Sequence, residues 1–164
     1  MGLRSRRHRA AISVAAVAVL ALVSAACSDD DGGPTGATGE ETGAAGAVDV
    51  TVQEFAVIPA SSSAAAGDVT FDVTNEGPDD VHEFVVFLTD LAPDALPTNE
   101  DGSVDEEGEG VALQGEIEDI AVGDTQSVTI DLAAGNYVLI CNIYDADEQE
   151  AHYQEGMRVA FTVE

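Results

Sequence analysis

After residue 47 the chain consists of short apolar runs that alternate with polar residues and end in turn-forming residues. Residues 49–55 (DVTVQEF) and 69–74 (VTFDVT) alternate in this way, and the second run is followed by NEGP, a strong turn signal. No segment after residue 26 repeats its apolar residues every 3.6 positions over the length of a helix. Many short strands separated by turns are typical of two packed sheets. The pattern therefore predicts an all-β fold, an antiparallel β-sandwich, for residues 48–164.

Further segments have the length and composition of strands, at residues 81–88, 127–132, 137–141 and 157–163. The first of them is a continuous run of β-branched and aromatic residues, which predicts a strand buried on both faces. The last one alternates, and its apolar face is made of Met157, Val159, Phe161 and Val163. Hydrophobic residues make up 45% of the chain, which is too much for a wholly disordered acidic protein.

Residues 90–115 lack this pattern of short apolar runs, because they combine two prolines with an acidic, glycine-rich sequence. We expect a long solvated loop between two strands here, with a short helical turn near residues 94–96. The carboxylates of this segment lack the ligand spacing of an EF-hand, so a calcium site is not expected.

The first 26 residues have the three parts of a secretory signal peptide. Four arginines within residues 1–9 precede a nearly uncharged apolar stretch at residues 10–23, which is shorter than the roughly 20 residues of a membrane-spanning helix. A permanent membrane helix is therefore the weaker interpretation. The stretch ends in LVSAAC, which resembles a bacterial lipobox, in which the cysteine, here Cys27, is lipidated and becomes the first mature residue. Ordinary cleavage after Ala26 is the alternative.

Glycine, threonine, alanine and acidic residues without periodicity make up residues 28–46. Such a composition cannot build a core, so residues 27–47 are predicted to be a flexible acidic linker. The linker would connect a lipid anchor to the folded domain at residues 48–164. This organisation predicts an extracytoplasmic protein of the bacterial cell envelope, attached to the membrane by lipid.

The charge of the chain is strongly one-sided, with 32 acidic residues against five basic ones and a formal net charge of −27. Four of the five arginines lie in the signal peptide, and removing it changes the net charge to −31, with Arg158 the one basic residue left. Such a surface repels phosphate, which excludes nucleic-acid binding. It favours a protein partner with a basic surface, or simply keeps the protein soluble.

Few residues that bind soft metal ions remain once the signal peptide is removed. The mature chain has two histidines, one methionine and one thiol besides Cys27, and these are His82, His152, Met157 and Cys141. Two imidazoles, a thiolate and a thioether form the ligand set of a blue-copper electron-transfer site. The sulfur ligands stabilise Cu(I), the imidazoles suit both oxidation states, and the methionine tunes the reduction potential as a weak axial ligand.

Each of these residues also has a simpler interpretation. A lone cysteine at the end of a strand is usually a small buried hydrophobe, and Met157 continues an apolar strand face. A histidine in a β-protein is usually a surface residue or a satisfied core residue. Outside the cytoplasm, however, an unpaired thiol such as Cys141 is expected to have a function.

The order and context of these residues resemble the cupredoxins, the family of plastocyanin and azurin. Residues 75–82 (NEGPDDVH) are similar to the segment that delivers the first histidine of that family. Residues 137–141 (YVLIC) and 152–157 (HYQEGM) look like its C-terminal ligand loop. The resemblance covers residues 48–164 and implies a Greek-key β-sandwich with one type 1 copper ion. It implies three equatorial ligands and one axial ligand, namely His82, Cys141 and His152 with Met157.

The chain departs from the family in the length of one loop. Cupredoxins usually place about two to four residues between the cysteine and the second histidine, whereas ten residues (142–151) intervene here. By the logarithmic rule of loop closure, the longer loop costs about 0.8 kcal/mol, which is small beside the roughly 10 kcal/mol of tight metal binding. The longer loop therefore permits ligation.

The resemblance implies a carrier of single electrons and not an enzyme. No further histidines remain for the second copper site of the oxidase relatives, and no motif of a hydrolytic triad is present. In the family the electron commonly passes through the C-terminal histidine, here His152. We expect a monomer whose redox partner has a basic surface, such as a cytochrome. Two alternatives remain open: a copper-binding or delivery protein, and a cupredoxin-like binding module with an empty site.

Overall fold

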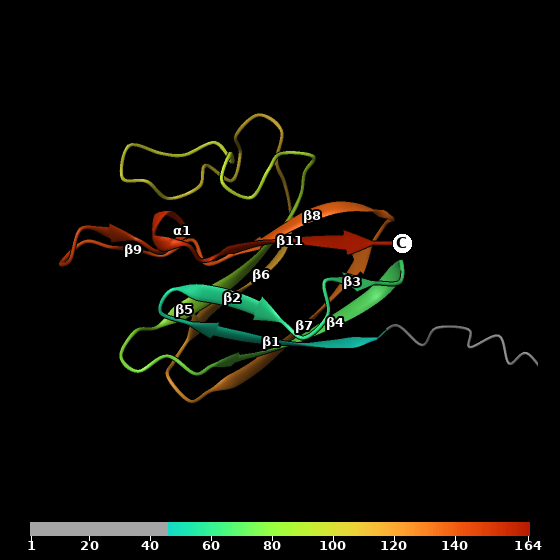
Figure 1. Cartoon of the computed structure of the whole chain (residues 1–164), viewed down its shortest axis with the longest axis horizontal. Helices are drawn as coiled ribbons and strands as arrows, with labels where there is room; N and C mark the ends of the chain where they lie inside the picture. The colour runs from blue at the N-terminus through green and yellow to red at the C-terminus, as the bar shows by residue number, and fades with distance from the viewer. Residues whose placement is uncertain (1–45) are drawn as a thin grey trace, which may run out of the picture. The chain divides into compact units, whose positions relative to one another are not determined.

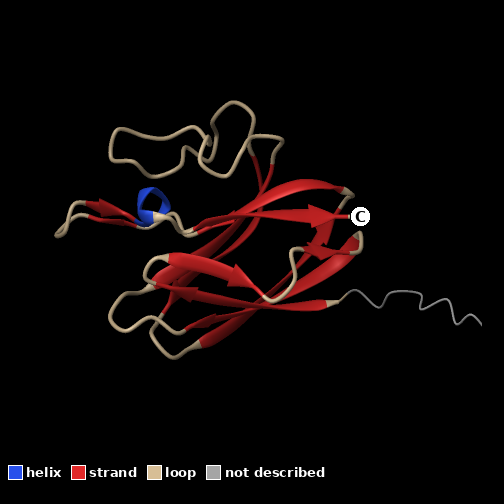
Figure 2. Ribbon diagram, viewed as in Figure 1, coloured by secondary structure: helices blue, strands red, loops and turns tan. Residues whose placement is uncertain are grey.

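The computed structural model describes residues 46–164, so the predicted signal peptide, Cys27 and most of the predicted linker lie outside the described residues. Within this range the chain forms strands and one short helix (Figure 2). The elements are β1 (Ala47–Gln53), β2 (Ala56–Pro59), β3 (Ser63–Ala64), β4 (Gly67–Asn75), β5 (His82–Leu88), β6 (Ala112–Ile120), β7 (Thr125–Leu132), β8 (Gly135–Ile140), β9 (Tyr144–Asp145), β10 (Glu150–Ala151), α1 (His152–Glu155) and β11 (Arg158–Val163).

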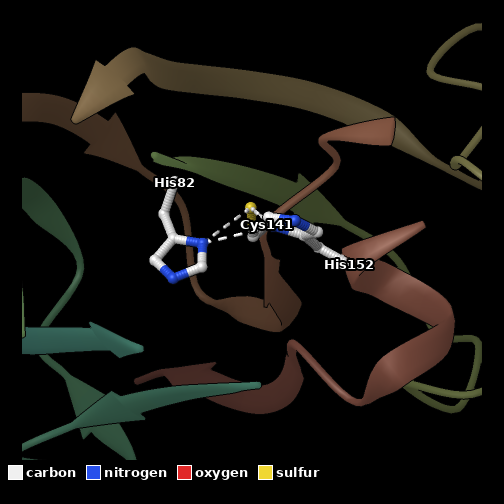
Figure 3. A group of neighbouring side chains, drawn as sticks. All are labelled: His82, Cys141 and His152. Carbon is white, nitrogen blue, oxygen red and sulfur yellow. Dashed lines mark hydrogen bonds between the residues drawn. The ribbon is translucent and has the colours of Figure 1, made fainter. Parts of the chain in front are cut away.

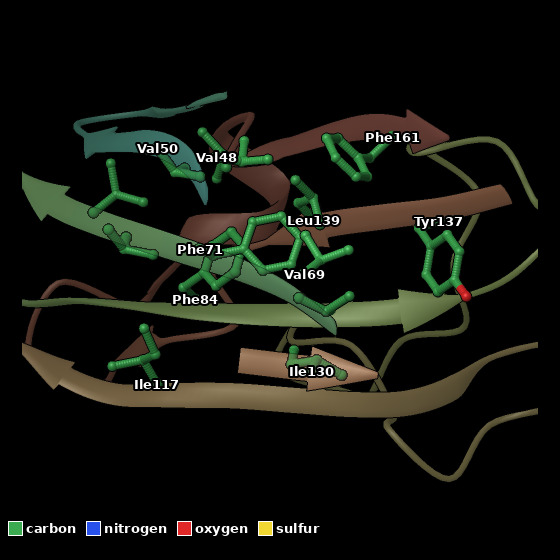
Figure 4. Close-up of a cluster of buried hydrophobic side chains, with 14 of the residues drawn as sticks. Val48, Val50, Val69, Phe71, Phe84, Ile117, Ile130, Tyr137, Leu139 and Phe161 are labelled. Atoms are coloured by element: carbon green, nitrogen blue, oxygen red, sulfur yellow. The ribbon is translucent and has the colours of Figure 1, made fainter. Parts of the chain in front are cut away.

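Two sheets form the two layers of a β-sandwich (Figure 1). One sheet has the strand order β2-β1-β4-β7, and the other has the order β3-β11-β8-β5-β6, while β9 and β10 form a separate hairpin. The all-β sandwich predicted from the sequence is confirmed. Apolar side chains from both sheets fill the space between the layers, among them Val50, Phe71, Phe84, Leu139 and Phe161 (Figure 4).

The alternation seen in the sequence matches the burial of the strands. In β4 the side chains of Val69, Phe71 and Val73 are fully buried, while their polar neighbours face outward. The strand predicted to be buried on both faces is β5, in which Phe84 and Val86 belong to the main core. Their neighbours Val85 and Phe87 belong to a second apolar cluster on the other face of the same sheet, which also contains Leu96, Val104, Val138, Ile140 and Tyr153.

The sheets are mixed, whereas the sequence analysis predicted an antiparallel sandwich. β1 pairs with β4 in parallel, and the edge strand β3 pairs with β11 in parallel. The reason is that the chain leaves the first sheet after the β1–β2 hairpin, adds β3 to the edge of the second sheet, and returns as β4 beside β1. Such a crossover brings two strands of the same direction together.

The segment expected to be a solvated loop is partly packed. Between β5 and β6, residues 89–111 (the 89–111 loop) place Leu96 and Val104 into the second apolar cluster, and a hydrogen-bonded turn joins Ala92 to Ala95 in place of the expected helical turn. The end of the segment belongs to β6, which the sequence analysis did not predict. β6 is an edge strand with two irregularities in its pairing to β5, so its sequence does not alternate cleanly.

Across residues 46–164, the one helix is a single turn, and no helix could span a membrane.

Candidate metal centre

The fold brings His82, Cys141 and His152 together at one end of the sandwich. β5 and β8 pair antiparallel, so the start of β5 lies beside the end of β8. His82 is the first residue of β5, and Cys141 directly follows β8. His152 is the first residue of α1, which follows the β9–β10 hairpin.

The three side chains turn their ligand atoms toward one another (Figure 3). Nδ1 of His82 lies 3.2 Å from Nδ1 of His152, and the Cys141 sulfur lies 3.8 Å and 3.4 Å from these two nitrogens. All three side chains are buried, with exposed fractions of 0% for His82, 0% for Cys141 and 2% for His152. The sequence analysis had singled out these three residues, which are separated by up to 70 positions in the chain.

The triangle of ligand atoms has the size that a metal ion requires. From its three edges, a point equally distant from the two nitrogens and the sulfur lies about 2.0 Å from each of them. Nitrogen and sulfur ligands hold zinc at about 2.0–2.3 Å, and the ligand atoms here are spaced for bonds of that length. The triangle therefore fits one metal ion without a rearrangement of the backbone.

Burial sets the protonation of the ligands. It lowers the pKa of His82, which the neighbouring His152 lowers further, and it also lowers the pKa of His152. Both imidazoles are therefore neutral at neutral pH and can use a lone pair for a metal. Burial raises the pKa of the Cys141 thiol to about 12, so the sulfur keeps its proton until a metal replaces it.

The fourth predicted ligand, Met157, is tied to two of the others through the backbone. The Cys141 N–H donates to the Met157 carbonyl at 3.1 Å, and the Met157 N–H donates to the His152 carbonyl at 3.1 Å. The Met157 side chain is fully buried and packs in the apolar cluster that contains Cys141. Met157 thus lies next to the three converging residues, at the point where α1 leads into β11.

No protein-family model matches the chain, and no curated protein sequence matches it. Among solved structures, the Na-dithionite reduced auracyanin from the photosynthetic bacterium Roseiflexus castenholzii aligns over 74% of this chain and 99% of its own, with a TM-score of 0.51 and 19% identity. The chain has the cupredoxin fold. Two other solved structures are similar at lower scores. They are auracyanin A, a "blue" copper protein from Chloroflexus aurantiacus (19% identity, 73% of this chain, 100% of that chain, TM-score 0.47), and an azurin from Methylomonas sp. strain J (16%, 74%, 99%, 0.46).

The extended loop of this cupredoxin fold is itself ordered by hydrogen bonds. β9 and β10 pair antiparallel, and the turn between them is closed by Asp145, whose Oδ1 accepts the N–H groups of Asp147 and Glu148 at 2.7 and 3.0 Å. At the base of the hairpin, the His152 N–H donates to the Ile143 carbonyl at 2.9 Å. The ten residues between Cys141 and His152 therefore fold back on themselves and return the chain to the site.

The 89–111 loop holds both ends of this insertion. The Asn142 Nδ2 donates to the Val104 carbonyl at 3.1 Å, directly after Cys141. At the other end, the Tyr153 hydroxyl donates to the Pro93 carbonyl at 2.8 Å and accepts the Leu96 N–H at 3.1 Å. Asn142 and Tyr153, which directly follow Cys141 and His152, are thus both held by the same loop.

Two acidic residues near the ligands were missed by the sequence analysis. The Glu83 N–H lies 3.4 Å from the Cys141 sulfur, and its Oε1 accepts the Asn142 N–H at 2.9 Å. Burial raises the pKa of Glu83 to about 7. On the other side of the site, Oε1 of Glu54 lies 3.8 Å from Nε2 of His82. No pattern in the sequence distinguishes these carboxylates from those that face solvent.

A pocket of about 500 Å³ lies beside His152 and is acidic. The carboxylates that line it belong to Asp79, Asp80, Asp119 and Asp145. Asp80 and Glu150 also form a second group of possible ligands with His152, with ligand atoms within 4.8 Å of one another. Because this group shares His152 with the buried triangle, it is not an independent site.

Proposed function

We propose that this protein is a blue-copper electron carrier, with one type 1 copper ion held by His82, Cys141 and His152 and by Met157 as the axial ligand. The observation that carries the proposal is the buried triangle of two imidazole nitrogens and one thiol sulfur, sized for a single ion. A trigonal set of two histidines and one cysteine with a weak axial methionine is diagnostic of blue copper. When bound, the ion would supply a one-electron couple between Cu(I) and Cu(II).

The protein's contribution is to hold the ligands in place. Two of the three ligands are placed by paired strands, since His82 begins β5 and Cys141 directly follows β8. The 89–111 loop and the hairpin fix the position of His152. The low exposure of all three keeps water from the metal. Ligands that cannot move between the two oxidation states allow electron transfer with little reorganisation.

The test is reconstitution of the full chain, purified in detergent, with Cu(II). We expect an intense visible charge-transfer band that disappears and returns on reduction and oxidation. The variant Cys141→Ser should lose the band, and the matched control Cys27→Ser, which removes the other cysteine of the chain, should keep it. A pale site selective for Cu(I) would instead support a copper-delivery protein, and no binding would support a module with an empty site.

We also propose that the protein is extracytoplasmic and anchored by lipid at Cys27. The support is the sequence of residues 1–27, with its basic head, apolar stretch and lipobox-like end. The same control variant tests it, because incorporation of a labelled fatty acid in cells should be lost in Cys27→Ser and retained in Cys141→Ser.

The electron partner is proposed to be a protein with a basic surface, such as a cytochrome, that docks near His152. The acidic pocket beside this histidine supports the proposal, together with the net charge of −27. Opposite charges at the two surfaces accelerate encounter and are screened by salt. Electron transfer to a cationic cytochrome should therefore slow as ionic strength rises, and a rate independent of salt would contradict this docking.

A further inference from the structure

Two neighbouring side chains, His82 and Glu54, each carry one buried polar atom without a hydrogen-bond partner. Within the described residues, Nε2 of His82 and Oε2 of Glu54 are the buried side-chain nitrogen or oxygen atoms that have no partner. The other carboxylate oxygen of Glu54, Oε1, lies 3.8 Å from Nε2 of His82. An unsatisfied buried polar atom is costly, and one such atom on each of two adjacent side chains points to an interaction that forms in another state of the protein.

The position of Glu54 is built by several parts of the fold. Glu54 lies in the turn between β1 and β2, and its side chain is 13% exposed. The backbone N–H groups of Asp79 and Asp80 donate to its Oε1 at 3.2 and 2.6 Å. At Gly77, a β-carbon would overlap the carboxylate, so the absence of a side chain there makes room for it. The carboxylate is therefore held by groups that do not belong to its own strand.

Metal binding at Nδ1 decides where the proton of the His82 ring must lie. Nδ1 faces Cys141 and His152, so its lone pair would be used for the ion, and the neutral ring then carries its proton on Nε2. That N–H faces the Glu54 carboxylate. The 3.8 Å between Oε1 and Nε2 exceeds the length of a charge-assisted hydrogen bond by about 1 Å, so forming the bond requires a rotation of one of the two side chains.

We propose that Glu54 is a positioning residue of the metal centre: its carboxylate accepts the Nε2–H of metal-bound His82, fixes the tautomer of the ring and favours the oxidised ion. This inference rests on the proposed function. The sign follows from charge, because a buried negative group stabilises Cu(II) relative to Cu(I) and so lowers the reduction potential. Outer partners of metal-binding histidines typically change metal affinity by about 10–100-fold when removed.

The test compares Glu54→Gln with wild type in the full chain loaded with copper. Glutamine keeps an oxygen for the two backbone donors but removes the charge. We expect the ratio of Cu(II) to Cu(I) affinity to fall about tenfold, which raises the potential by about 59 mV, with the visible band retained. The matched control is Asp101→Asn, in which an exposed carboxylate that also accepts a backbone N–H loses its charge, and its potential should stay near that of wild type.

A second readout follows the proton itself. In the diamagnetic Cu(I) form, the Nε2–H of wild-type His82 should give a slowly exchanging, downfield NMR signal that moves upfield in Glu54→Gln. If that variant does not fold, Gly77→Ala serves in its place, because the added methyl group displaces the carboxylate and should raise the potential in the same direction.

The outcomes separate the two proposals. Equal potentials in wild type and Glu54→Gln, with the visible band present in both, would overturn the role of Glu54 and leave the electron carrier intact. A rapidly exchanging Nε2–H in the wild-type protein would overturn it as well. A wild-type chain that binds no copper would overturn the proposed function, and with it this inference.

Discussion

Asn75, at the end of β4, ties together the loop that leads into the first histidine of the site. The residue is fully buried. Its Nδ2 donates to the carbonyls of Asp80 and Ile120 at 2.8 and 2.9 Å, and its Oδ1 accepts the Gly77 N–H at 2.9 Å. One side chain thus fixes both ends of the turn after β4 and joins it to the end of β6. Asn75→Ala removes all three hydrogen bonds at once.

The expected loss of stability follows from these three bonds. Each contributes about 0.5–1.5 kcal/mol net, and the loss is larger where a buried group is left without a partner, so Asn75→Ala should lower the free energy of unfolding by about 2–4 kcal/mol. For a domain of this length, that corresponds to a fall in Tm of roughly 10 °C. The alanine also leaves a small cavity, which adds to the loss.

Urea unfolding of the metal-free protein, followed by circular dichroism, measures the effect. The midpoint should fall while the slope of the free energy with urea stays the same. Asn136→Ala is the control, because Asn136 is exposed and its side chain makes one hydrogen bond, to Asp90, so its loss should stay within about 0.5 kcal/mol. If Asn75→Ala loses less than about 1 kcal/mol, or no more than the control, the three bonds do not stabilise the turn as argued.

Three further predictions concern the ligand loop and the metal. Tyr153→Phe removes a buried hydroxyl with two hydrogen bonds and should lower the free energy of unfolding in urea by about 1–3 kcal/mol. An unchanged midpoint would show that the hydrogen bonds to the 89–111 loop do not stabilise the site. Because burial raises the pKa of Cys141 to about 12 and lowers those of both histidines, copper binding above pH 7 releases the thiol proton alone. The apparent affinity should therefore rise about tenfold per pH unit in chelator competition, and a flat profile would show that the thiol is already ionised. Removing the negative charges of the inserted hairpin should raise the reduction potential in a redox titration, and an unchanged potential would refute their influence. The residues to neutralise are Asp145, Asp147, Glu148 and Glu150.

The strands that could be predicted are those whose burial differs between their two faces. In β1, β4 and β7 apolar and polar residues alternate, because one face of the strand meets the core and the other meets solvent. In β5 the apolar residues are continuous, because both faces are covered. β6 escaped prediction for the same physical reason. Most of its residues are exposed or half-buried, and only Ile117 and Ile120 are buried, so the burial signal that defines a strand in a sequence is weak there.

The ligands of the candidate site could be predicted because their chemistry is rare in this chain. Soft and imidazole donors are so few that their types alone suggest a site. Carboxylates carry no such information here, since 32 acidic residues are spread over residues 29–164. Glu54 and Glu83 differ from the rest only in what the fold places around them, a neighbouring imidazole in one case and a buried backbone N–H in the other.

The long insertion between Cys141 and His152 illustrates why loop length alone says little about a site. Closing a flexible loop of ten residues costs about 0.8 kcal/mol more free energy than closing a loop of the usual length. In the fold, however, the Ile143 carbonyl and the His152 N–H meet at the base of a hairpin, so the span that must be ordered for ligation is only Asn142 and Ile143. Asn142 is held by the 89–111 loop, which also holds Tyr153 on the far side of the histidine. The hairpin can therefore vary in length without moving the ligands, whereas the loop that clamps its two ends cannot.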